Sequence, residues 1–385
     1  SVLSSMARLL AVALLSLLQA AVGARRRLGG VSAMAPRTAL EGYSFEKFAR
    51  DFGRNYAPGS REFKQRQALF ATSLLEVHET NARNAKEGRG WVAGVNTFMD
   101  WTVAERRALH GYKPAGPRSG QRSVAFIHEG AAVRGRVSTA LNMSLGSVGG
   151  LDADAGPAMR QQGNCGSCWA ISAVEAVEAQ LQRSGVLVPQ LSAQALVDCV
   201  PNPQHCGGSG GCDGATGELA YAFMRDHGIP LESDLQYTAR TAACPQAGLE
   251  GAWHATRRAR VGGWSQLPSN QADPLKAALV SEGPVVVAVD GNNWFNYDNG
   301  VFDSCDKDAT LGHAVLAKGY GEDIGKKYWL IQNSWGSDWG EQGHIRLVMH
   351  DNEDQWCGTD KKPQEGVGCD GGPAQVTVCG TCGIL

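Results

Sequence analysis

The sequence predicts an α+β protein that is exported and cross-linked by disulfides. Residues 60–84 repeat apolar side chains at helical spacing, whereas residues 284–290 and 311–321 are short apolar runs bounded by proline or glycine, as in strands. All 11 cysteines lie at or beyond Cys165. An odd number in an exported chain is typical of paired disulfides with one thiol left free, so we expect ten of the 11 to be paired.

The charge of the chain is unevenly distributed. Its 385 residues carry a net charge of −2, which disfavours a dedicated nucleic-acid binder. Residues 25–143 contain 20 Lys and Arg against 10 Asp and Glu, a balance of +10, while residues 144–385 contain 15 against 28, a balance of −13. This asymmetry predicts two parts with different roles, and we hypothesise that their attraction helps to hold them together.

The first residues have the composition of an export signal. Arg8 precedes an apolar run from Leu9 to Leu18, and small residues follow up to Ala24, an order typical of a cleaved signal peptide. The run is shorter than the ~20 residues of a membrane-spanning helix. We therefore expect a signal peptide at residues 6–24, no membrane span, and a destination in the secretory pathway, either the lysosome or vacuole or the extracellular space.

Two helices are predicted in the cysteine-free part. Phe45, Phe48 and Phe52 recur at helical spacing, and a longer helix covers roughly Ser60 to Asn84 with Ser60 as its N-cap. On the longer helix, positions that step by three or four form one stripe on one face. The stripe consists of Glu62, Arg66, Phe70, Ser73, Val77 and Asn81.

This stripe resembles the ERFNIN motif of papain-like peptidase propeptides, with Ser and Val in place of the first Asn and the Ile. Farther along, Gly94-x-Asn96-x-Phe98-x-Asp100 resembles the GNFD motif of the same propeptides. Either match alone is compatible with an ordinary amphipathic helix or a loop, but their order is that of the family. The resemblance implies an inhibitory propeptide that lies along the active cleft in reverse direction and blocks it.

Residues 113–143 have the composition of a linker. Arg134-Gly-Arg136 offers basic processing sites, and Asn142 begins the chain's N-glycosylation sequon. We expect the mature N-terminus between about Arg136 and Gly150, in this exposed segment. The predicted organisation is propeptide and linker at residues 25–143 and a peptidase domain at residues 144–385.

The stretch Gln162-Gly-Asn-Cys165-Gly-Ser-Cys168-Trp169 is followed by a helical pattern that closes at Gly185. Cys168 is therefore predicted at the N-terminus of a helix, where the partial positive charge stabilises an anion. A thiolate in such a position has a lowered pKa, and the thiolate is the nucleophilic form of cysteine.

The Cys-Gly-Ser-Cys-Trp sequence resembles the signature around the nucleophile of papain-like cysteine peptidases, and the chain as a whole resembles their cathepsin L-like members. Segments similar to the family's His and Asn motifs surround His313 and Asn333, which lie 145 and 165 residues after Cys168. The resemblance implies Cys168 as nucleophile, His313 as base and Asn333 as the residue that orients the imidazole. The Gln162 side chain and the Cys168 backbone N–H would form the oxyanion hole.

The resemblance also implies a two-lobed fold, with a mainly helical lobe that carries Cys168 and a β-barrel-like lobe that carries His313 and Asn333. The active cleft would run between the lobes, and Trp335 would shield the His–Asn contact from solvent. The implied substrate cleft consists of Gly214, Ala215, Ala288, Gly312, Ala314 and Trp335. Ala215 stands where the family normally has glycine, so we expect its methyl to narrow the cleft.

By the same resemblance, Cys165 pairs with Cys212, Cys199 pairs with Cys244, and Cys305 pairs toward the C-terminus. Six cysteines then remain without an assigned partner, with 15 possible connectivities: Cys206, Cys305, Cys357, Cys369, Cys379 and Cys382. Both Cys357-Gly and Cys382-Gly are similar to the family's last Cys-Gly. Residues 359–381 form an insertion rich in glycine and cysteine, and Leu385 stands where the family has a further closing segment, which is compatible with an incomplete C-terminus.

Other functions remain open at this point. Cys165-x-x-Cys168 also fits a redox pair, or half a zinc site with Cys379-x-x-Cys382, but export favours disulfides. Two classes of function stay open: an active endopeptidase, and a catalytically silent homologue that acts as a binding protein. Exopeptidase action is a variant of the active class. The favoured prediction is an endopeptidase that acts on polypeptides, is inhibited by its own propeptide, needs no cofactor or metal, does not bind nucleic acid, and is a monomer.

Overall fold

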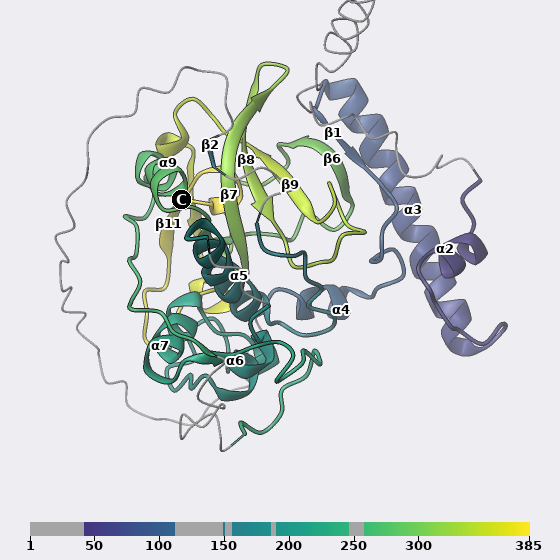
Figure 1. Ribbon diagram of the computed structural model, residues 1–385. Coiled ribbons are helices and arrows are strands. Elements are labelled where there is room, and N and C mark those ends of the chain that lie inside the picture. Colours follow the sequence, from purple (N-terminus) through teal and green to yellow (C-terminus); the bar gives the residue numbers. More distant parts are fainter. Residues whose placement is uncertain (1–41, 112–148, 151–155, 186–189, 246–257) are drawn as a thin grey trace, which may run out of the picture. The chain divides into compact units, whose positions relative to one another are not determined.

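The computed structural model describes residues 42–111, 149–150, 156–185, 190–245 and 258–385 (Figure 1). The predicted signal peptide, the linker with Asn142 and the predicted mature N-terminus lie outside these residues, apart from Gly149 and Gly150. None of the helices in the described ranges combines the length and apolar composition that a membrane crossing requires.

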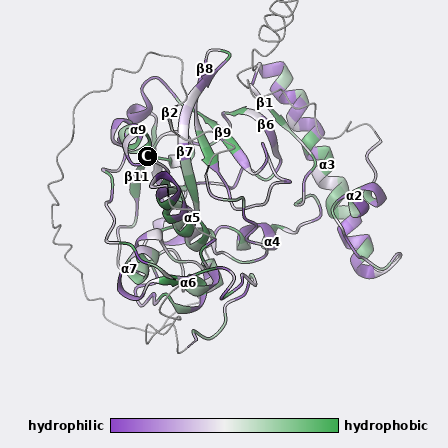
Figure 2. Ribbon diagram, viewed as in Figure 1, coloured by the Kyte–Doolittle hydropathy of each residue, from purple (hydrophilic) through white to green (hydrophobic). Residues whose placement is uncertain are grey.

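The N-terminal part, residues 42–111, contains three helices and a strand: α2 (Phe45–Asp51), α3 (Arg61–Glu87), β1 (Trp91–Ala93) and α4 (Val103–Ala108). Helix α3 begins and ends near the predicted positions. The Ser60 hydroxyl accepts a hydrogen bond from the Phe63 backbone N–H at 3.1 Å, and Gly88 ends the helix in the left-handed conformation with φ 68°. Along α2 and α3 polar and apolar residues alternate (Figure 2), as in helices with one buried face.

The predicted stripe on α3 is the packing face of that helix. Phe70, Ser73 and Val77 are buried, and Arg66 forms a 2.7 Å ion pair with Glu105 on α4. Near the end of the stripe, the Asn81 side chain donates to the Ala93 carbonyl of β1 at 2.9 Å. The stripe therefore holds the other elements of the N-terminal part against α3.

The N-terminal part is joined to the rest of the chain by backbone pairing. Strand β1 pairs antiparallel with β6 (Tyr297–Phe302), and the Asn96 side chain donates to the Phe295 carbonyl at 2.6 Å. Gly300 permits the close approach, because a Cβ there would lie 2.1 Å from the Gly90 carbonyl oxygen. The pairing makes β1 an edge strand of the sheet in the second half.

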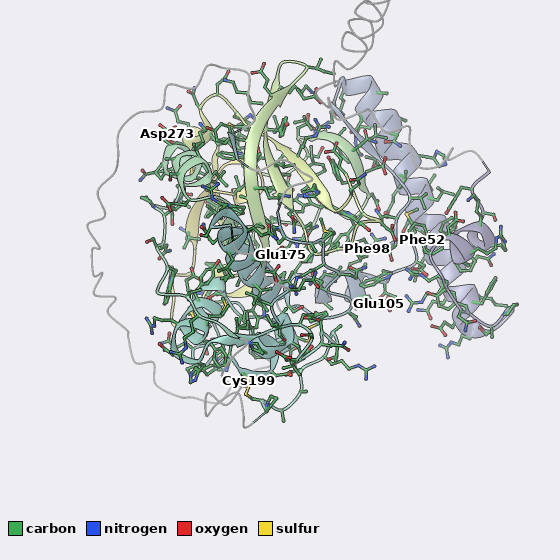
Figure 3. The ribbon with its side chains drawn as sticks, viewed as in Figure 1. Phe52, Phe98, Glu105, Glu175, Cys199 and Asp273 are labelled. Atoms are coloured by element: carbon green, nitrogen blue, oxygen red, sulfur yellow. A yellow bond between two sulfur atoms is a disulfide. The ribbon has the colours of Figure 1, made fainter. Side chains whose placement is uncertain are left out.

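The helical part contains α5 (Cys168–Arg183), α6 (Ala193–Cys199), α7 (Gly217–His227) and the 3₁₀ turn η1 (Gly211–Asp213), with the short strands β3 (Ile229–Pro230) and β4 (Arg258–Ala259). Helix α5 is buried almost throughout, including Glu175, which Figure 3 labels, and Glu178. The Glu178 carboxylate forms a 2.6 Å ion pair with Arg160 and accepts the Leu191 backbone N–H. These partners satisfy its charge inside the fold.

The second half is built on a seven-stranded sheet. Its order is β1-β6-β9-β8-β7-β2, with β5 paired to β7. The remaining strands are β2 (Gly149–Gly150), β5 (Val285–Val289), β7 (His313–Asp323), β8 (Lys326–Gln332) and β9 (His344–Val348), and α9 (Ala272–Ser281) contacts β7. Strands β5 and β7 confirm the predicted strands at residues 284–290 and 311–321. The mixed helix and sheet architecture is the predicted α+β class.

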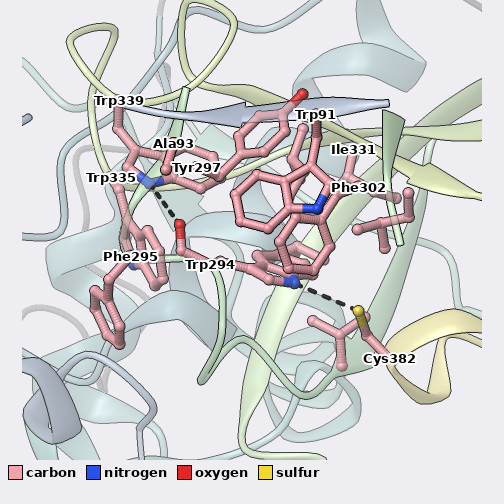
Figure 4. Close-up of a cluster of buried hydrophobic side chains, with 14 of the residues drawn as sticks. Trp91, Ala93, Trp294, Phe295, Tyr297, Phe302, Ile331, Trp335, Trp339 and Cys382 are labelled. Atoms are coloured by element: carbon pink, nitrogen blue, oxygen red, sulfur yellow. Dashed lines mark hydrogen bonds between the residues drawn. The ribbon is translucent and has the colours of Figure 1, made fainter. Parts of the chain in front are cut away.

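An aromatic cluster lies beside the sheet (Figure 4). Trp294, Trp335 and Trp339 are fully buried, and the Trp339 indole N–H donates to the Trp294 carbonyl at 3.2 Å. The N-terminal part contributes Trp91, whose ring lies 4.7 Å from that of Phe302. Residues 42–111 thus share a core with the sheet and do not merely lie on its surface.

All 11 cysteines are described, and ten of them are paired. Cys165–Cys212 and Cys199–Cys244 are the pairings implied by the resemblance. The others are Cys206–Cys369, Cys305–Cys382 and Cys357–Cys379. Cys382, not Cys357, is therefore the partner of Cys305. The last of these pairs joins β10 (Cys357–Asp360) to β11 (Val376–Cys379), near the 3₁₀ turns η2 (Glu353–Gln355), η3 (Pro363–Glu365) and η4 (Thr381–Gly383).

Candidate active site

The unpaired cysteine, Cys168, is the first residue of α5. Its side chain is buried, and its Sγ lies 3.5 Å from the backbone N–H of Ala314 on β7. Helix α5 and strand β7 make extensive contacts, so the start of the helix is held against the start of the strand. The sequence places a thiol at a helix N-terminus, and the fold brings it to the sheet.

His313 is the first residue of β7, and its imidazole is oriented by Asn333. The ring Nε2 lies 2.8 Å from the Asn333 Oδ1, and the same oxygen accepts the Ser334 backbone N–H at 2.8 Å. The Trp335 ring stacks on the imidazole at 5.1 Å and is fully buried. No described group hydrogen-bonds the buried Nδ1, which leaves this nitrogen available for proton transfer.

Gln162 is held rigidly near the start of α5. Its Oε1 accepts the Ser334 hydroxyl at 2.7 Å, and its Nε2 donates to the Cys165 carbonyl at 2.8 Å. The same Nε2 donates to the carbonyl of Leu109 in the N-terminal part at 2.9 Å. A polar group from residues 42–111 thus occupies the donor predicted for the oxyanion hole.

His110 and Gly111 also lie in the site, next to His313 and Cys168. The His110 ring lies 5.5 Å from the His313 ring. A Cβ on Gly111 would lie 3.4 Å from the Cys168 Sγ, and a Cβ on Gly214 would lie 1.3 Å from the Gly111 carbonyl oxygen. The two glycine backbones are therefore in contact, and the N-terminal part covers the thiol.

Two family models match the chain. The papain family cysteine protease model matches residues 153–367, more than half of the 385 residues. The cathepsin propeptide inhibitor domain model matches residues 45–105.

The chain belongs to the papain family of cysteine proteases. It is 33% identical over 322 residues to a cathepsin L-like proteinase of Phaedon cochleariae, covering 82% of this chain and 90% of that protein. It is 32% identical over 325 residues to digestive cysteine proteinase 1 of Homarus americanus, with coverages of 82% and 92%. The structure of digestive procathepsin L 3 from Tenebrio molitor larval midgut superposes with a TM-score of 0.64 at 29% identity, covering 81% of this chain and 94% of that one.

In this papain-family precursor the site is buried, and residues 42–111, which we now call the propeptide, lie against it. Burial raises the pKa of Cys168 to about 11, against the lowering hydrogen bonds from Ala314, Trp169 and its own backbone. Burial also lowers the pKa of His313 to about 4, despite its bond to Asn333. Burial and the position at the helix N-terminus thus act in opposite directions on the pKa of Cys168, and in the precursor burial has the larger effect.

The predicted cleft residues fall into two groups. Gly214 contacts Gly111, Gly312 lies near His110, Ala314 lies at Cys168, and Ala288 pairs with Ala314 in the β5–β7 register. Ala215 differs. Its side chain packs in the apolar core of the helical part, and it is absent from the described non-glycine residues with positive φ. Narrowing of the cleft by the Ala215 methyl stays a prediction.

Three contributors to the protease site were not predicted. Ser334 links Gln162 to the Asn333 segment, Tyr237 donates to the Gln162 carbonyl at 2.8 Å, and His110 covers His313. Ser334 follows Asn333 directly, so its position was a usable signal. Tyr237 and His110 lie far in sequence from Cys168, His313 and Asn333, and only the fold brings them to the site.

Proposed function

We propose that this protease is the precursor of a cysteine endopeptidase in which Cys168 is the nucleophile, His313 the general base and acid, and Asn333 the residue that orients the imidazole. One observation carries the proposal. Of 11 cysteines, the one without a disulfide begins a helix and lies against the strand that starts with His313. A disulfide-rich protein that leaves one thiol at such a place is organised for nucleophilic chemistry.

The mechanism follows from the positions of these groups. With the propeptide removed, the Cys168 thiol transfers its proton to the Nδ1 of His313, and the thiolate attacks the carbonyl carbon of a peptide bond. His313 then gives the proton to the leaving amine. Water, deprotonated by His313, then attacks the thioester carbon; the C–S bond breaks, the acid is released, and His313 returns the proton to the Cys168 sulfur. Asn333 keeps the ring aligned through the Nε2 bond of 2.8 Å.

The oxyanion of each tetrahedral intermediate would accept hydrogen bonds from the Gln162 side chain and the Cys168 backbone N–H. A single donor of this kind typically contributes about 3–4 kcal/mol to transition-state stabilisation. In the precursor the Leu109 carbonyl accepts from Gln162 at 2.9 Å. The propeptide therefore inhibits by supplying its own carbonyl to the donor that the reaction requires.

We further propose the organisation predicted from the sequence: a signal peptide at residues 6–24, propeptide and linker at residues 25–143, and a catalytic domain at residues 144–385. Entry into the secretory pathway, glycosylation at Asn142, a lysosomal, vacuolar or extracellular destination, and a monomeric state belong to the same proposal. The ten paired cysteines support an oxidising compartment.

Hydrolysis of a denatured protein by the acid-processed chain tests the proposal. We expect internal cleavage that is lost in Cys168→Ala and His313→Ala, while Cys168→Ala still folds and retains the propeptide. Undiminished cleavage by Cys168→Ala would contradict the assigned nucleophile. A fully processed wild-type chain that binds the denatured protein without cutting it would instead favour the catalytically silent binding protein.

A further inference from the structure

The segment between β10 and β11, residues 361–375, has no role in the proposed chemistry. It contains η3, Cys369 and several glycines, and we call it the strap. Its two ends lie together, because β10 and β11 pair antiparallel and Cys357–Cys379 links them. The strap is therefore a loop that projects from a cross-linked hairpin, and its contacts show what it reaches.

One side of the strap is attached to the helical part. Cys369 forms a disulfide with Cys206, and the Gly207 backbone N–H donates to the Gly368 carbonyl at 3.1 Å. On the other side of the disulfide, the Asp370 carboxylate lies 2.8 Å from the Nδ1 of His205. A covalent bond and two flanking polar contacts fix the strap at this point.

The other side of the strap is attached to the sheet part, immediately before His313. Asp360, at the base of the strap, is buried, and its carboxylate accepts the Thr310 hydroxyl at 3.2 Å and the Leu311 backbone N–H at 3.3 Å. Gly366 lies so close that a Cβ there would be 2.4 Å from the Leu311 carbonyl oxygen. The strap thus packs on the backbone that leads into the candidate base.

Both attachments border the path of the propeptide. A Cβ on Gly208, next to the Gly207 attachment, would lie 2.9 Å from the Gly111 carbonyl oxygen. A Cβ on Gly312 would lie 3.7 Å from the His110 carbonyl oxygen and 3.9 Å from the Glu365 carbonyl oxygen of the strap. The strap therefore joins segments of both walls of the cleft beside His110 and Gly111, the propeptide residues that lie next to His313 and Cys168.

We propose that the strap bounds one end of the substrate cleft and limits how far a bound polypeptide extends past the cleavage site in that direction. This inference rests on the proposed function. An extended chain needs about 3.3 Å of free cleft per residue, and a disulfide-anchored loop across both walls removes that space. The strap is thus a specificity element that selects substrates by the length of chain on one side of the cleaved bond.

The test compares nested peptides that share one cleavage sequence and are lengthened by one to four residues, in one direction or the other. For the acid-processed wild type, we expect kcat/KM to fall about ten- to a hundredfold when extension in one direction passes the strap, with no comparable fall in the other direction. Each value is divided by the same enzyme's kcat/KM for the shortest peptide, so that a general loss of activity cancels.

Two variants remove the restriction in different ways. Cys206→Ala with Cys369→Ala releases the strap, and replacement of residues 363–372 by a short Gly-Ser linker with Cys206→Ala shortens it. The matched control is Cys199→Ala with Cys244→Ala, which removes a disulfide of the helical part that has no bond to the strap. We expect the length penalty to shrink to within about threefold in a released or shortened strap and to persist in the control.

An equal length dependence in wild type and both strap variants would overturn the proposal, as would equal tolerance of extension in both directions by the wild type. A lower Tm with an unchanged length profile would likewise overturn it, because the strap would then serve stability alone. If the processed wild type fails to cut even the shortest peptide, the proposed function fails, and the strap proposal with it.

Discussion

At the residue scale, His110 links the propeptide to pH. Its side chain is buried beside His313, and its pKa is lowered to about 3 by burial and then by the charge of His313. A released propeptide would regain the ordinary value near 6.5. Because the docked pKa is the lower one, docking is strongest above about pH 6.5 and weakens as pH falls from there toward about 3.

We therefore predict that His110→Gln lowers the pH at which half of the propeptide is released. Glutamine takes up no proton, so this residue no longer weakens docking as the pH falls. Each pH unit through that window weakens docking by up to about tenfold per linked histidine. To measure release, the full-length precursor is incubated at each pH and the appearance of peptidase activity is recorded. The control variant is His78→Gln, on the exposed face of α3. A release profile identical to wild type would exclude His110 as a pH-responsive group.

Gln162 is the side-chain donor of the proposed oxyanion hole. If its Nε2 stabilises the oxyanion, Gln162→Ala lowers kcat by about 10²–10³, with a smaller effect on KM. Steady-state kinetics on the processed enzyme measure this. A loss confined to KM would assign Gln162 to ground-state binding instead.

At the scale of elements, α3 decides whether the propeptide stays folded. Phe70 is buried on its packing face, whereas Leu75 on the same helix is 57% exposed. We predict that Phe70→Ala lowers the free energy of unfolding by about 3–5 kcal/mol. Leu75→Ala is expected to lower it by much less. Thermal unfolding of the full precursor compares the two. Equal losses would mean that the stripe does not direct the packing.

Some of the helices and strands could be predicted from the sequence, and others could not. Helix α3 was predictable because its cap and its stripe are local signals, and β5 and β7 because their apolar runs are continuous. Strand β1 was not predicted. Only three residues long, it is defined by its pairing with β6, which lies about 200 residues later. Short edge strands of this kind carry no periodicity of their own to detect.

At the scale of the whole molecule, both an ion pair and apolar contacts connect the described part of the propeptide to the sheet part. Arg89–Asp303 pairs the propeptide with the sheet part at 3.0 Å, but Arg54–Asp100 and Arg66–Glu105 are internal to the propeptide. Exposed pairs contribute about 0–1 kcal/mol, whereas Trp91 and Phe98 bury aromatic rings in the shared core.

We accordingly predict that salt between 50 and 500 mM changes the rate of propeptide release at fixed pH by less than about tenfold. The measurement uses full-length precursor and follows the loss of the propeptide band with time. A much steeper acceleration by salt would restore the view that attraction between the basic and acidic parts holds the precursor closed.

The residues of the candidate site could be predicted from the sequence, but the pKa of Cys168 and the pairing of the later cysteines could not. Cys168, His313, Asn333 and Gln162 lie in distinctive local sequences, and the fold brings them together. Burial raises the pKa of Cys168, and its Sγ lies beside Gly111, some 60 residues earlier in the chain. The Cys206–Cys369 disulfide belongs to one of the 15 connectivities that the sequence left open for six cysteines. Properties that arise from distant contacts require the fold.

The central claim is that Cys168 is a nucleophile which the propeptide keeps inactive. The most direct measurement is labelling with an active-site-directed epoxide before and after acid processing, with the modified peptide identified by mass spectrometry. We expect rapid labelling of Cys168 alone after processing, little in the intact precursor, and none in processed His313→Ala. Equal labelling of the intact precursor would contradict the covered, un-ionised thiol, and absence of labelling after complete processing would contradict the nucleophile itself.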